Sequence, residues 1–413
     1  MPISASIKAN LYKDSVALMR IAQVVLARER VQGATLLMGT PANKGLLSAA
    51  GLFSADFDRA GPSDVMIVVD AETLEVVDAA LDEIGRLLEG EREPRSGGPA
   101  AARALRSIAM GAVRSTGAAL VQISVPGPYA AAEAMKALRQ GLHVFLFSDN
   151  VPLDQERAIK ALAREKGLLV MGPDCGTAII GGVPLGFANV VRRGGIGLVG
   201  ASGTGLQEVS CQIHALGQGV RHAIGTGGRD VSAEIGGTTM EQAIELLAAD
   251  AGTRVIAIVS KPPAPAVARR VLERLAAVDK PVVVLFLGAD LSAERLPEHV
   301  LPVTTLYDAA AAAVSLLDGG RYVRSVPSEE SLRVAQAEAK RLAPGQRNVR
   351  GLYSGGTFCT EAQLVWAAMG LRVHSNAPLD KRAVLHGDAV GGGHVAIDLG
   401  ADEFTVGRPH PMI

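Results

Sequence analysis

Short segments made almost entirely of apolar residues alternate with amphipathic segments between residues 118 and 317. Strands buried on both faces of a parallel sheet have this uniform apolar character, whereas half-exposed strands alternate. The pattern therefore predicts α/β domains in which a helix follows each buried strand. The predicted strands are Leu120–Val125, His143–Phe147, Leu168–Met171, Ile196–Val199, His222–Gly225, Val255–Val259 and Val282–Leu287.

The composition excludes several classes of protein. The chain has 413 residues, with 41 Lys and Arg against 42 Asp and Glu, and this balance argues against a nucleic-acid binder, which carries a basic excess. No apolar run approaches the roughly 20 residues of a membrane span, and the amino terminus lacks the features of a signal peptide. Three widely spaced cysteines fit free thiols, so we expect a cytoplasmic protein with no membrane partner.

A glycine-rich turn, Ser202-Gly203-Thr204-Gly205, joins the strand at Ile196–Val199 to the next helix. The first amides of a helix lack intrahelical partners and lie at the positive end of its dipole, so glycines let an anion approach them. The alternative is an ordinary N-cap with glycines for tight packing. We favour a phosphate or carboxylate site, with Ser202 and Thr204 as catalytic candidates, because ligands bind at the carboxyl ends of parallel strands.

The same strand–turn–helix unit occurs twice. One turn into the first helix lies Glu208, which either orients a reacting group or is a solvated residue favoured by the helix dipole. The second copy spans Arg350–Ala362, and it either completes a two-sided phosphate grip or is a structural duplicate. Its candidate phosphate-binding residues are Ser354, Gly355, Gly356 and Thr357.

Other polar residues follow predicted strands of residues 100–190. Pro126, Asn150 and Pro152 lie in two loops that either connect elements or line a cofactor site. A third loop contains Asp174 and Cys175, which we take as candidate substrate contacts. Cys175 is either a nucleophile or a buried structural thiol, and the structural interpretation is preferred because no activating residue adjoins it.

No metal site is predicted. The carboxyl-terminal region is rich in His and acidic residues, but their spacing matches no compact metal motif. These residues are His386, His394, Asp398, Asp402, Glu403 and His410.

Several stretches between residues 118 and 317 resemble the α subunit of succinyl-CoA synthetase and the NDP-forming acyl-CoA synthetases. They are VPGPYAAAEAMKALRQG, SDNVP, MGPDCG, RRGGIGLVGASGTGLQEV, GTGGRDVSAEIGGTTMEQAIELL and KPVVVLFLGAD. Two further stretches, MGTPANKG and DEFTVGRPHPMI, are similar to the FdrA family more narrowly.

The resemblance implies an α/β protein of four parts. The pattern of apolar and amphipathic segments itself predicts the first part, a small α+β domain at residues 1–90, and a charged, glycine-containing linker follows at residues 91–99. The other parts are a Rossmann-like CoA-binding-type domain at residues 100–190, a flavodoxin-like ligase-CoA-type domain at residues 194–325, and an incomplete second ligase-type domain at residues 346–413.

The resemblance also implies roles for residues. The turn at Ser202 matches the phosphate-binding helix start of the synthetases, and Glu208 matches the acidic residue associated with their phosphohistidine. The loops with Pro126, Asn150 and Pro152 line the CoA site in those enzymes. CoA is therefore the one cofactor that the resemblance suggests, and no cofactor is certain.

One departure bears on mechanism. After the strand that corresponds to Val282–Leu287, ligases carry Gly-His-Ala-Gly-Ala with the phosphorylated histidine, whereas this sequence reads GADLSAERLPEHVLPV, with His299 in a different setting. Their acidic GEIGG-type loop is replaced by Ser260-Lys261-Pro262-Pro263. The apparatus that passes phosphate to a nucleotide is therefore expected to be absent.

These features predict carbamoyl or acyl transfer through an acyl phosphate held at helix starts, without phosphohistidine. FdrA-type proteins are associated with oxamate carbamoyl transfer in purine and allantoin breakdown, which converts oxalurate and phosphate to oxamate and carbamoyl phosphate. The alternatives are an NDP-forming acyl-CoA synthetase and a non-catalytic scaffold that binds CoA or an anion. The expected partners are an acyl phosphate or oxamate-type substrate and further subunits, in a hetero-oligomer or a homodimer.

Overall fold

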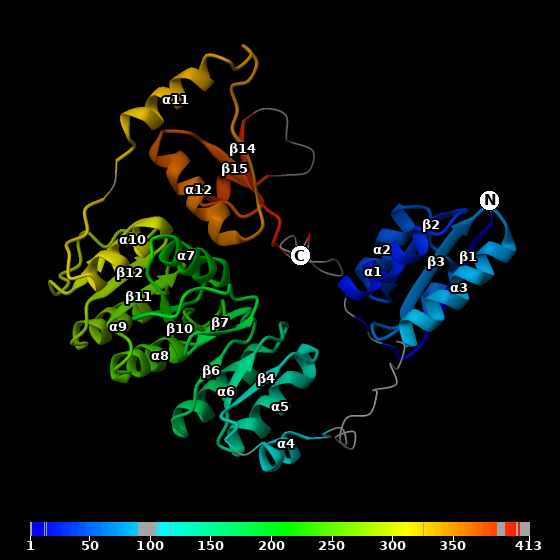
Figure 1. Ribbon diagram of the computed structural model, residues 1–413, viewed down its shortest axis with the longest axis horizontal. Helices are drawn as coiled ribbons and strands as arrows, with labels where there is room; N and C mark the ends of the chain where they lie inside the picture. The colour runs from blue at the N-terminus through cyan, green and yellow to red at the C-terminus, as the bar shows by residue number, and fades with distance from the viewer. Residues whose placement is uncertain are drawn as a thin grey trace. The chain divides into compact units, whose positions relative to one another are not determined.

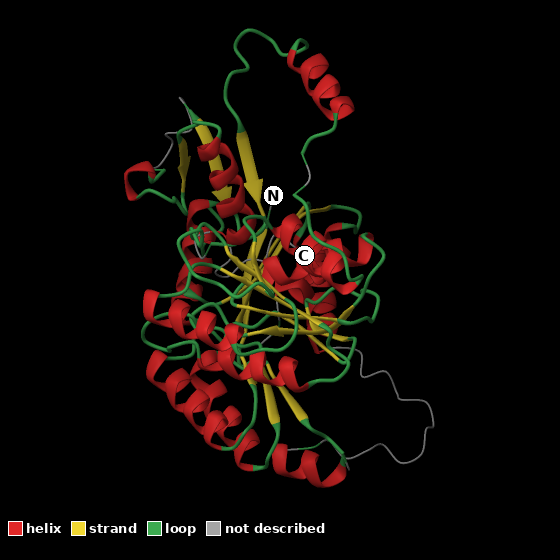
Figure 2. Ribbon diagram, turned by 90° about the vertical axis from the view of Figure 1, so that its left-hand side faces the viewer, coloured by secondary structure: helices red, strands yellow, loops and turns green. Residues whose placement is uncertain are grey.

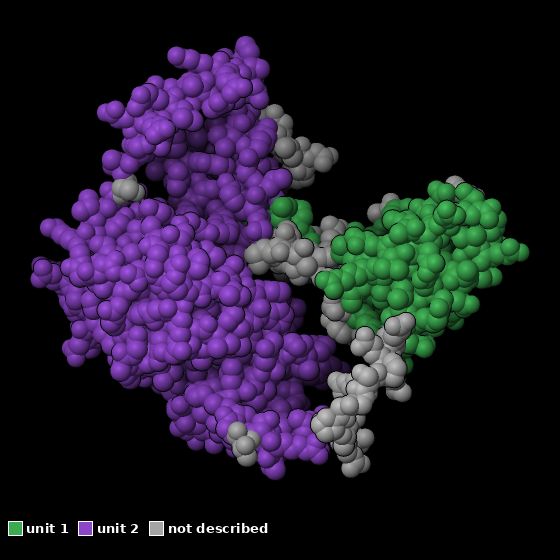
Figure 3. All heavy atoms as spheres, in the orientation of Figure 1, with its two compact units in different colours: residues 1–103, 398–413 green, residues 104–397 purple. Residues whose placement is uncertain are grey.

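A computed structural model describes residues 2–11, 13, 15–89, 105, 107–115, 117–324, 326–385, 393–401 and 404. The chain divides into two compact units, residues 1–103 with 398–413 and residues 104–397, which Figure 3 shows in different colours. The predicted linker at residues 91–99 lies outside the described residues.

The first unit is a small α+β fold, as predicted. Three antiparallel strands lie in the order β1-β3-β2, and the central strand β3 is buried because helices pack on its apolar residues. The strands are β1 Ile3–Lys8, β2 Val31–Met38 and β3 Val65–Ala71. The helices are α1 Ser15–Leu26, α2 Pro41–Ala49, η1 Ala55–Arg59 and α3 Leu74–Glu89.

The second unit begins with a three-stranded parallel sheet in the order β4-β5-β6. The three strands are short, and the last three residues of the central strand β5 are fully buried, which agrees with the uniform apolar pattern. The strands are β4 Leu120–Ile123, β5 His143–Leu146 and β6 Val170–Met171. The helices are α4 Ile108–Arg114, α5 Gly127–Arg139 and α6 Leu153–Glu165.

A seven-stranded sheet follows, in the order β13-β12-β11-β9-β10-β7-β8 (Figure 1). Counted along the chain from β9, its five parallel strands lie in the order 2-1-3-4-5, which is the flavodoxin-like arrangement. Helices pack on both faces of this sheet (Figure 2). Helices α7 and α10 contribute to the core on one face, and α8 and α9 contribute to the core on the other. The prediction of a flavodoxin-like domain is thereby confirmed.

The elements of this domain match most of the predicted segments. The strands are β7 Thr177–Ile180, β8 Val183–Gly186, β9 Ile196–Gly200, β10 Val220–Gly225, β11 Val255–Ser260, β12 Val282–Phe286 and β13 Val300–Pro302. The helices are α7 Gly203–Ala215, α8 Thr238–Ala249, α9 Pro265–Ala276 and α10 Leu306–Leu317.

The boundary between the two sheets differs from the prediction. Strands β7 and β8 fall within residues 100–190, yet β7 pairs antiparallel with β10 and so extends the larger sheet. A two-residue turn joins them, in which Gly181 and Gly182 both have positive φ, at 60° and 86°. Glycine pairs favour such hairpin turns because they adopt positive φ without strain, so the sequence contained this signal.

The last part of the second unit is a small sheet in the order β14-β16-β15. Helix α11, which precedes it, is exposed along its whole length. The strands are β14 Arg350–Tyr353, β15 Val373–Ser375 and β16 His394–Asp398. The helices are α11 Glu329–Ala339, α12 Gly356–Ala368 and η2 Lys381–Ala383.

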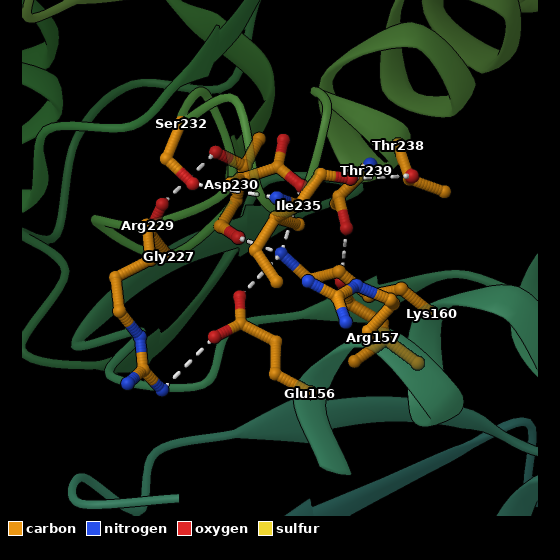
Figure 4. Close-up of polar contacts among 12 residues, drawn as sticks. Glu156, Arg157, Lys160, Gly227, Arg229, Asp230, Ser232, Ile235, Thr238 and Thr239 are labelled. Atoms are coloured by element: carbon orange, nitrogen blue, oxygen red, sulfur yellow. Dashed lines mark hydrogen bonds and ion pairs between the residues drawn. The ribbon is translucent and has the colours of Figure 1, made fainter. Parts of the chain in front are cut away.

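A buried lysine joins the first two sheets of this unit. Lys160 of α6 is 2% exposed, and its Nζ lies 2.8 Å from Oδ1 of Asp230 and 3.0 Å from Oε1 of Glu156 (Figure 4). The same ammonium donates to the Thr226 carbonyl at 3.1 Å. Asp230 and Thr226 belong to the loop after β10, so the ammonium ties a helix of one sheet to a loop of the other.

The surrounding groups complete this network. The Asp230 carboxylate accepts the amides of Thr239 and Met240, in the first turn of α8, at 3.1 and 2.9 Å. Arg229 lies 2.9 Å from the Glu156 carboxylate and also donates to the Val151 carbonyl at 2.7 Å. Two cations thus balance two carboxylates, which is how buried charges are tolerated.

Substitution Lys160→Met is expected to lower the free energy of unfolding by about 3–5 kcal/mol, because it leaves Glu156 and Asp230 without a shared buried cation. Urea unfolding followed by circular dichroism measures the change. Lys166→Met, at an exposed position one residue after α6, is the control and should alter stability by no more than about 0.5 kcal/mol. Equal effects of the two substitutions would contradict the assigned role of Lys160.

Candidate functional site

The glycine-rich turn lies at the carboxyl end of β9, where the strand order reverses between β10 and β11. Ser202 is the N-cap of α7, and its Oγ accepts the Gly205 amide at 3.0 Å. A Cβ on Gly200 would lie 1.8 Å from the Val259 carbonyl oxygen, and one on Gly205 would lie 2.5 Å from Ser202 Oγ. These glycines are therefore required by close packing, whatever ligand the turn binds.

The second turn meets the first directly. Ser202 Oγ and Thr357 Oγ1 are 2.6 Å apart and hydrogen-bonded, and a Cβ on Gly355 would lie 2.5 Å from the Thr204 methyl carbon. The amino ends of α7 and α12 thus abut, and we refer to them as the paired helix starts. The two turns therefore lie together, as a two-sided grip requires, but the hydroxyl groups of Ser202 and Thr357 bond to each other.

The two copies differ at the cap. In α12 the N-cap is Gly355, which has no side chain to accept an amide, and Ser354 precedes the cap. Five amides at the paired helix starts have no hydrogen-bond partner among the described residues. They belong to Gly203, Thr204, Gly356, Thr357 and Phe358. An oxyanion that reached this point would find several unsatisfied donors.

Glu208 and Glu361 occupy equivalent positions, four residues after Thr204 and Thr357 respectively. Glu361 was not predicted as a site residue, although the repeat could have identified it. Its Oε1 accepts the Leu306 amide at the start of α10, at 2.7 Å. Burial raises the pKa of Glu361, with a further increase from the neighbouring Glu208 carboxylate. Both carboxylates line an open groove of about 420 Å³.

The loops predicted to line a cofactor site lie at the carboxyl end of the β4-β5-β6 sheet. Pro126 and Pro152 are the N-caps of α5 and α6, without a side-chain hydrogen bond, and Asn150 is exposed with φ of 56°. A Cβ on Gly127 would lie 2.3 Å from the Asp149 carbonyl oxygen, so the two loops touch. Within the described residues, no hydrogen bond connects them to the paired helix starts.

Asp174 and Cys175 have opposite environments. Asp174 is exposed in the left-handed region, with φ of 55°, and its amide donates to the Ser148 carbonyl at 3.0 Å. Cys175 is 3% exposed, its Sγ contacts the Thr177 and Gly225 carbonyl oxygens at 3.5 and 3.4 Å, and burial raises its pKa to about 12. A buried neutral thiol offers no nucleophile or substrate contact, so the structure corrects the assignment of Cys175.

His299 lies at the opposite edge of the large sheet. It directly precedes β13, and its carbonyl accepts the Val282 amide at the start of β12. Parallel strands begin at the edge opposite to the one where they end, so His299 is remote from the paired helix starts.

Among the predicted carboxyl-terminal cluster, His386, Asp402, Glu403 and His410 lie outside the described residues. The His394 ring accepts the Val349 amide, and Asp398 accepts the Gly400 amide.

Two family profiles match the chain. The heavy metal-associated domain of AllF matches residues 1–104, and a CoA binding domain matches residues 192–288. The second match falls on the seven-stranded sheet, whereas the CoA-binding-type domain was predicted at residues 100–190. Within the described residues, no helix is both long and apolar enough to cross a membrane.

Similar proteins define the class. The chain is 31% identical over 159 residues to the α subunit of succinate–CoA ligase (ADP-forming) from Aquifex aeolicus, covering 36% of this chain and 50% of that subunit. The structure of an ATP citrate lyase from Methanothrix soehngenii aligns with 59% of this chain and 47% of that one, with a TM-score of 0.43 and 16% identity. The chain thus carries a CoA-binding domain of the acyl-CoA ligase-like class.

The family is narrower than this class. The chain is 43% identical over 414 residues to the uncharacterized protein YahF of Escherichia coli (strain K12), covering 100% of this chain and 79% of YahF. It belongs to the FdrA-type family of YahF-like proteins.

The amino-terminal unit does not fit a heavy-metal site, despite its family profile. Residues 1–104 contain neither cysteine nor histidine, the side chains that most often bind transition and heavy metal ions. Within the described residues, no three His, Cys, Asp or Glu side chains come together in a group that could hold a metal ion. The likeness of this unit to heavy metal-associated domains is one of fold.

The native protein is expected to show at most one reactive thiol of its three when titrated with a chromogenic disulfide at about pH 8, and three after denaturation. Cys175 and Cys359 are buried, whereas Cys211 is half-buried. Burial and the adjacent Glu208 raise the pKa of Cys211, so its reaction should be slow. Cys211→Ser should abolish the native reaction, and rapid reaction in that variant would show that Cys175 or Cys359 is accessible.

Proposed function

We propose that the chain works in an acyl-CoA ligase-like reaction and holds the phosphate of an acyl phosphate at the paired helix starts. The observation that carries the proposal is the meeting of two helix amino ends, joined through Ser202 and Thr357, at the point where the strand order reverses. The CoA binding domain profile, which includes the turn at Ser202, and the succinate–CoA ligase relatives support it.

The roles of this chain's residues follow from the geometry. The unpaired amides of Gly203, Thr204, Gly356 and Thr357 would bind phosphate oxygens, and the bonded Ser202–Thr357 hydroxyl pair would add the one O–H that its mutual hydrogen bond leaves free. Fixed donors stabilise the charge that develops on the phosphate as it leaves an attacked carbonyl. Glu208, half-exposed one turn further along α7, would position the reacting group.

CoA would be held at the carboxyl ends of the strands, where Asn150 and Lys261 present exposed polar side chains suited to its amides and phosphates. Lys261 directly follows β11, and its Nζ lies 3.5 Å from the position of a Cβ on Gly228. When bound, CoA supplies a thiol nucleophile. We also propose that the chain acts together with further subunits, in a hetero-oligomer or a homodimer.

The comparisons favour this reaction over the oxamate carbamoyl transfer expected from the sequence, because the reported relatives of known activity are CoA ligases and not carbamoyltransferases. Carbamoyl phosphate is itself an acyl phosphate and would bind the same donors. Since no described histidine lies at the paired helix starts, direct use of a preformed acyl phosphate is favoured over a phosphohistidine relay.

Ser202→Ala is expected to weaken the binding of inorganic phosphate about tenfold, measured by isothermal titration calorimetry, because one hydroxyl donor is lost. It should also lower the free energy of unfolding by about 0.5–2 kcal/mol through loss of the N-cap. Ser328→Ala removes an equivalent N-cap from the exposed helix α11 and is the matched control. It should leave phosphate binding unchanged, and equal phosphate affinity in both variants would contradict the site.

Turnover assays then separate the substrates. The chain with its partners is expected to form acyl-CoA and phosphate from CoA and an acyl phosphate, and this activity should fall in Ser202→Ala. If product forms only from carbamoyl phosphate and oxamate, the ligase-like proposal is wrong and the carbamoyl transfer predicted from the sequence is restored.

A further inference from the structure

The groove beside the paired helix starts gathers aromatic side chains. Tyr307, Tyr353, Phe358 and Trp366 line it, and these are four of the chain's 14 aromatic residues and include its one tryptophan. The Tyr353 and Trp366 rings lie 6.5 Å apart at an angle of 54°. Aromatic residues make up only 3% of the sequence, so their concentration in one groove distinguishes it from the rest of the surface. We call it the aromatic groove.

Two carboxylates share the aromatic groove with these rings. Each has one oxygen engaged, since Glu361 Oε1 accepts the Leu306 amide and Glu208 Oε1 accepts the Gln212 side chain at 2.7 Å. The second oxygen of each makes no hydrogen bond within the described part of the chain, and no described Lys, Arg or His forms an ion pair with either group. The nearby Asp308 is paired with Arg324 at 3.6 Å, so that cation is already engaged.

The aromatic groove therefore combines negative charge without a cationic partner and several partly exposed aromatic side chains. Aromatic faces attract cations, and planar cations can stack on a ring while their N–H groups donate to carboxylates. A volume of about 420 Å³ is within the range of small-molecule sites, roughly 300–1,000 Å³. Inorganic phosphate and other anions are repelled by such a groove, so its ligand differs from that of the paired helix starts.

We propose that the aromatic groove binds a small organic molecule through a guanidinium or amidinium group. The cation lies against the aromatic rings and donates to the second oxygens of Glu208 and Glu361. The proposal does not depend on the acyl-transfer function, because it rests on the aromatic rings and on a ligand of opposite charge, although the two proposals share Glu208.

Tryptophan fluorescence tests the proposal directly, because Trp366 is the only tryptophan and lines the groove. Titration of the full chain with ethylguanidinium is expected to change its emission in a saturable manner. Ethylurea, a neutral molecule of nearly the same shape, is the control ligand and should give no saturable change. The apparent affinity for ethylguanidinium should fall as salt concentration rises, because ions screen the attraction.

Two variants identify the binding groups. Glu361→Gln keeps an oxygen that accepts the Leu306 amide but removes the negative charge. Glu208→Gln likewise keeps an oxygen for the Gln212 side chain and removes the charge. Each is expected to weaken ethylguanidinium binding about tenfold or more, while Glu294→Gln at an exposed position should not change it. Circular dichroism verifies that the variants are folded. Equal responses to ethylurea and ethylguanidinium, or full binding in both groove variants, would overturn the proposal.

Discussion

One buried ammonium group determines how the first two sheets of the larger unit fit together. Lys160 extends from a helix of the β4-β5-β6 sheet and ends between Glu156 and Asp230, while Asp230 also caps the helix that follows β10. The loops at the carboxyl ends of both sheets are fixed by these bonds. Hydrophobic burial alone would allow the sheets to slide, whereas charged hydrogen bonds have defined directions and lengths.

The second constraint is the closeness of the backbone at the paired helix starts. Glycines at positions 200, 205 and 355 leave no room for a Cβ, and the two helix amino ends approach until Ser202 and Thr357 share a hydrogen bond. The amides without partners therefore lie together at the point where the strand order of the seven-stranded sheet reverses. The proposed phosphate site and the aromatic groove are then neighbours with opposite preferences for charge, on the same pair of helices.

Much of the fold could be predicted from the sequence, because uniformly apolar strands and glycine-rich turns leave few alternatives to a doubly wound sheet. The hairpin of β7 and β8 was not predicted, and its residues fell within the preceding predicted domain, because the pairing of β7 with the distant β10 leaves no local signal in the sequence. Ser202 and Thr357 were identified together, but their mutual hydrogen bond depends on a contact between residues 155 positions apart. Cys175 was wrongly taken as a substrate contact, because its burial depends on the packing of the folded chain. The aromatic groove could not be predicted, because α10 and α12 come together only in the folded chain.

The unequal caps of the two helices have a consequence for how the sequence can vary. Both copies have a threonine one residue into the helix, but only the first has a serine at the cap, where the second has glycine. The missing side chain at Gly355 leaves room for the methyl group of Thr204 from the first copy. The two turns are therefore not interchangeable, and the mutations tolerated in one are expected to depend on the residue present in the other.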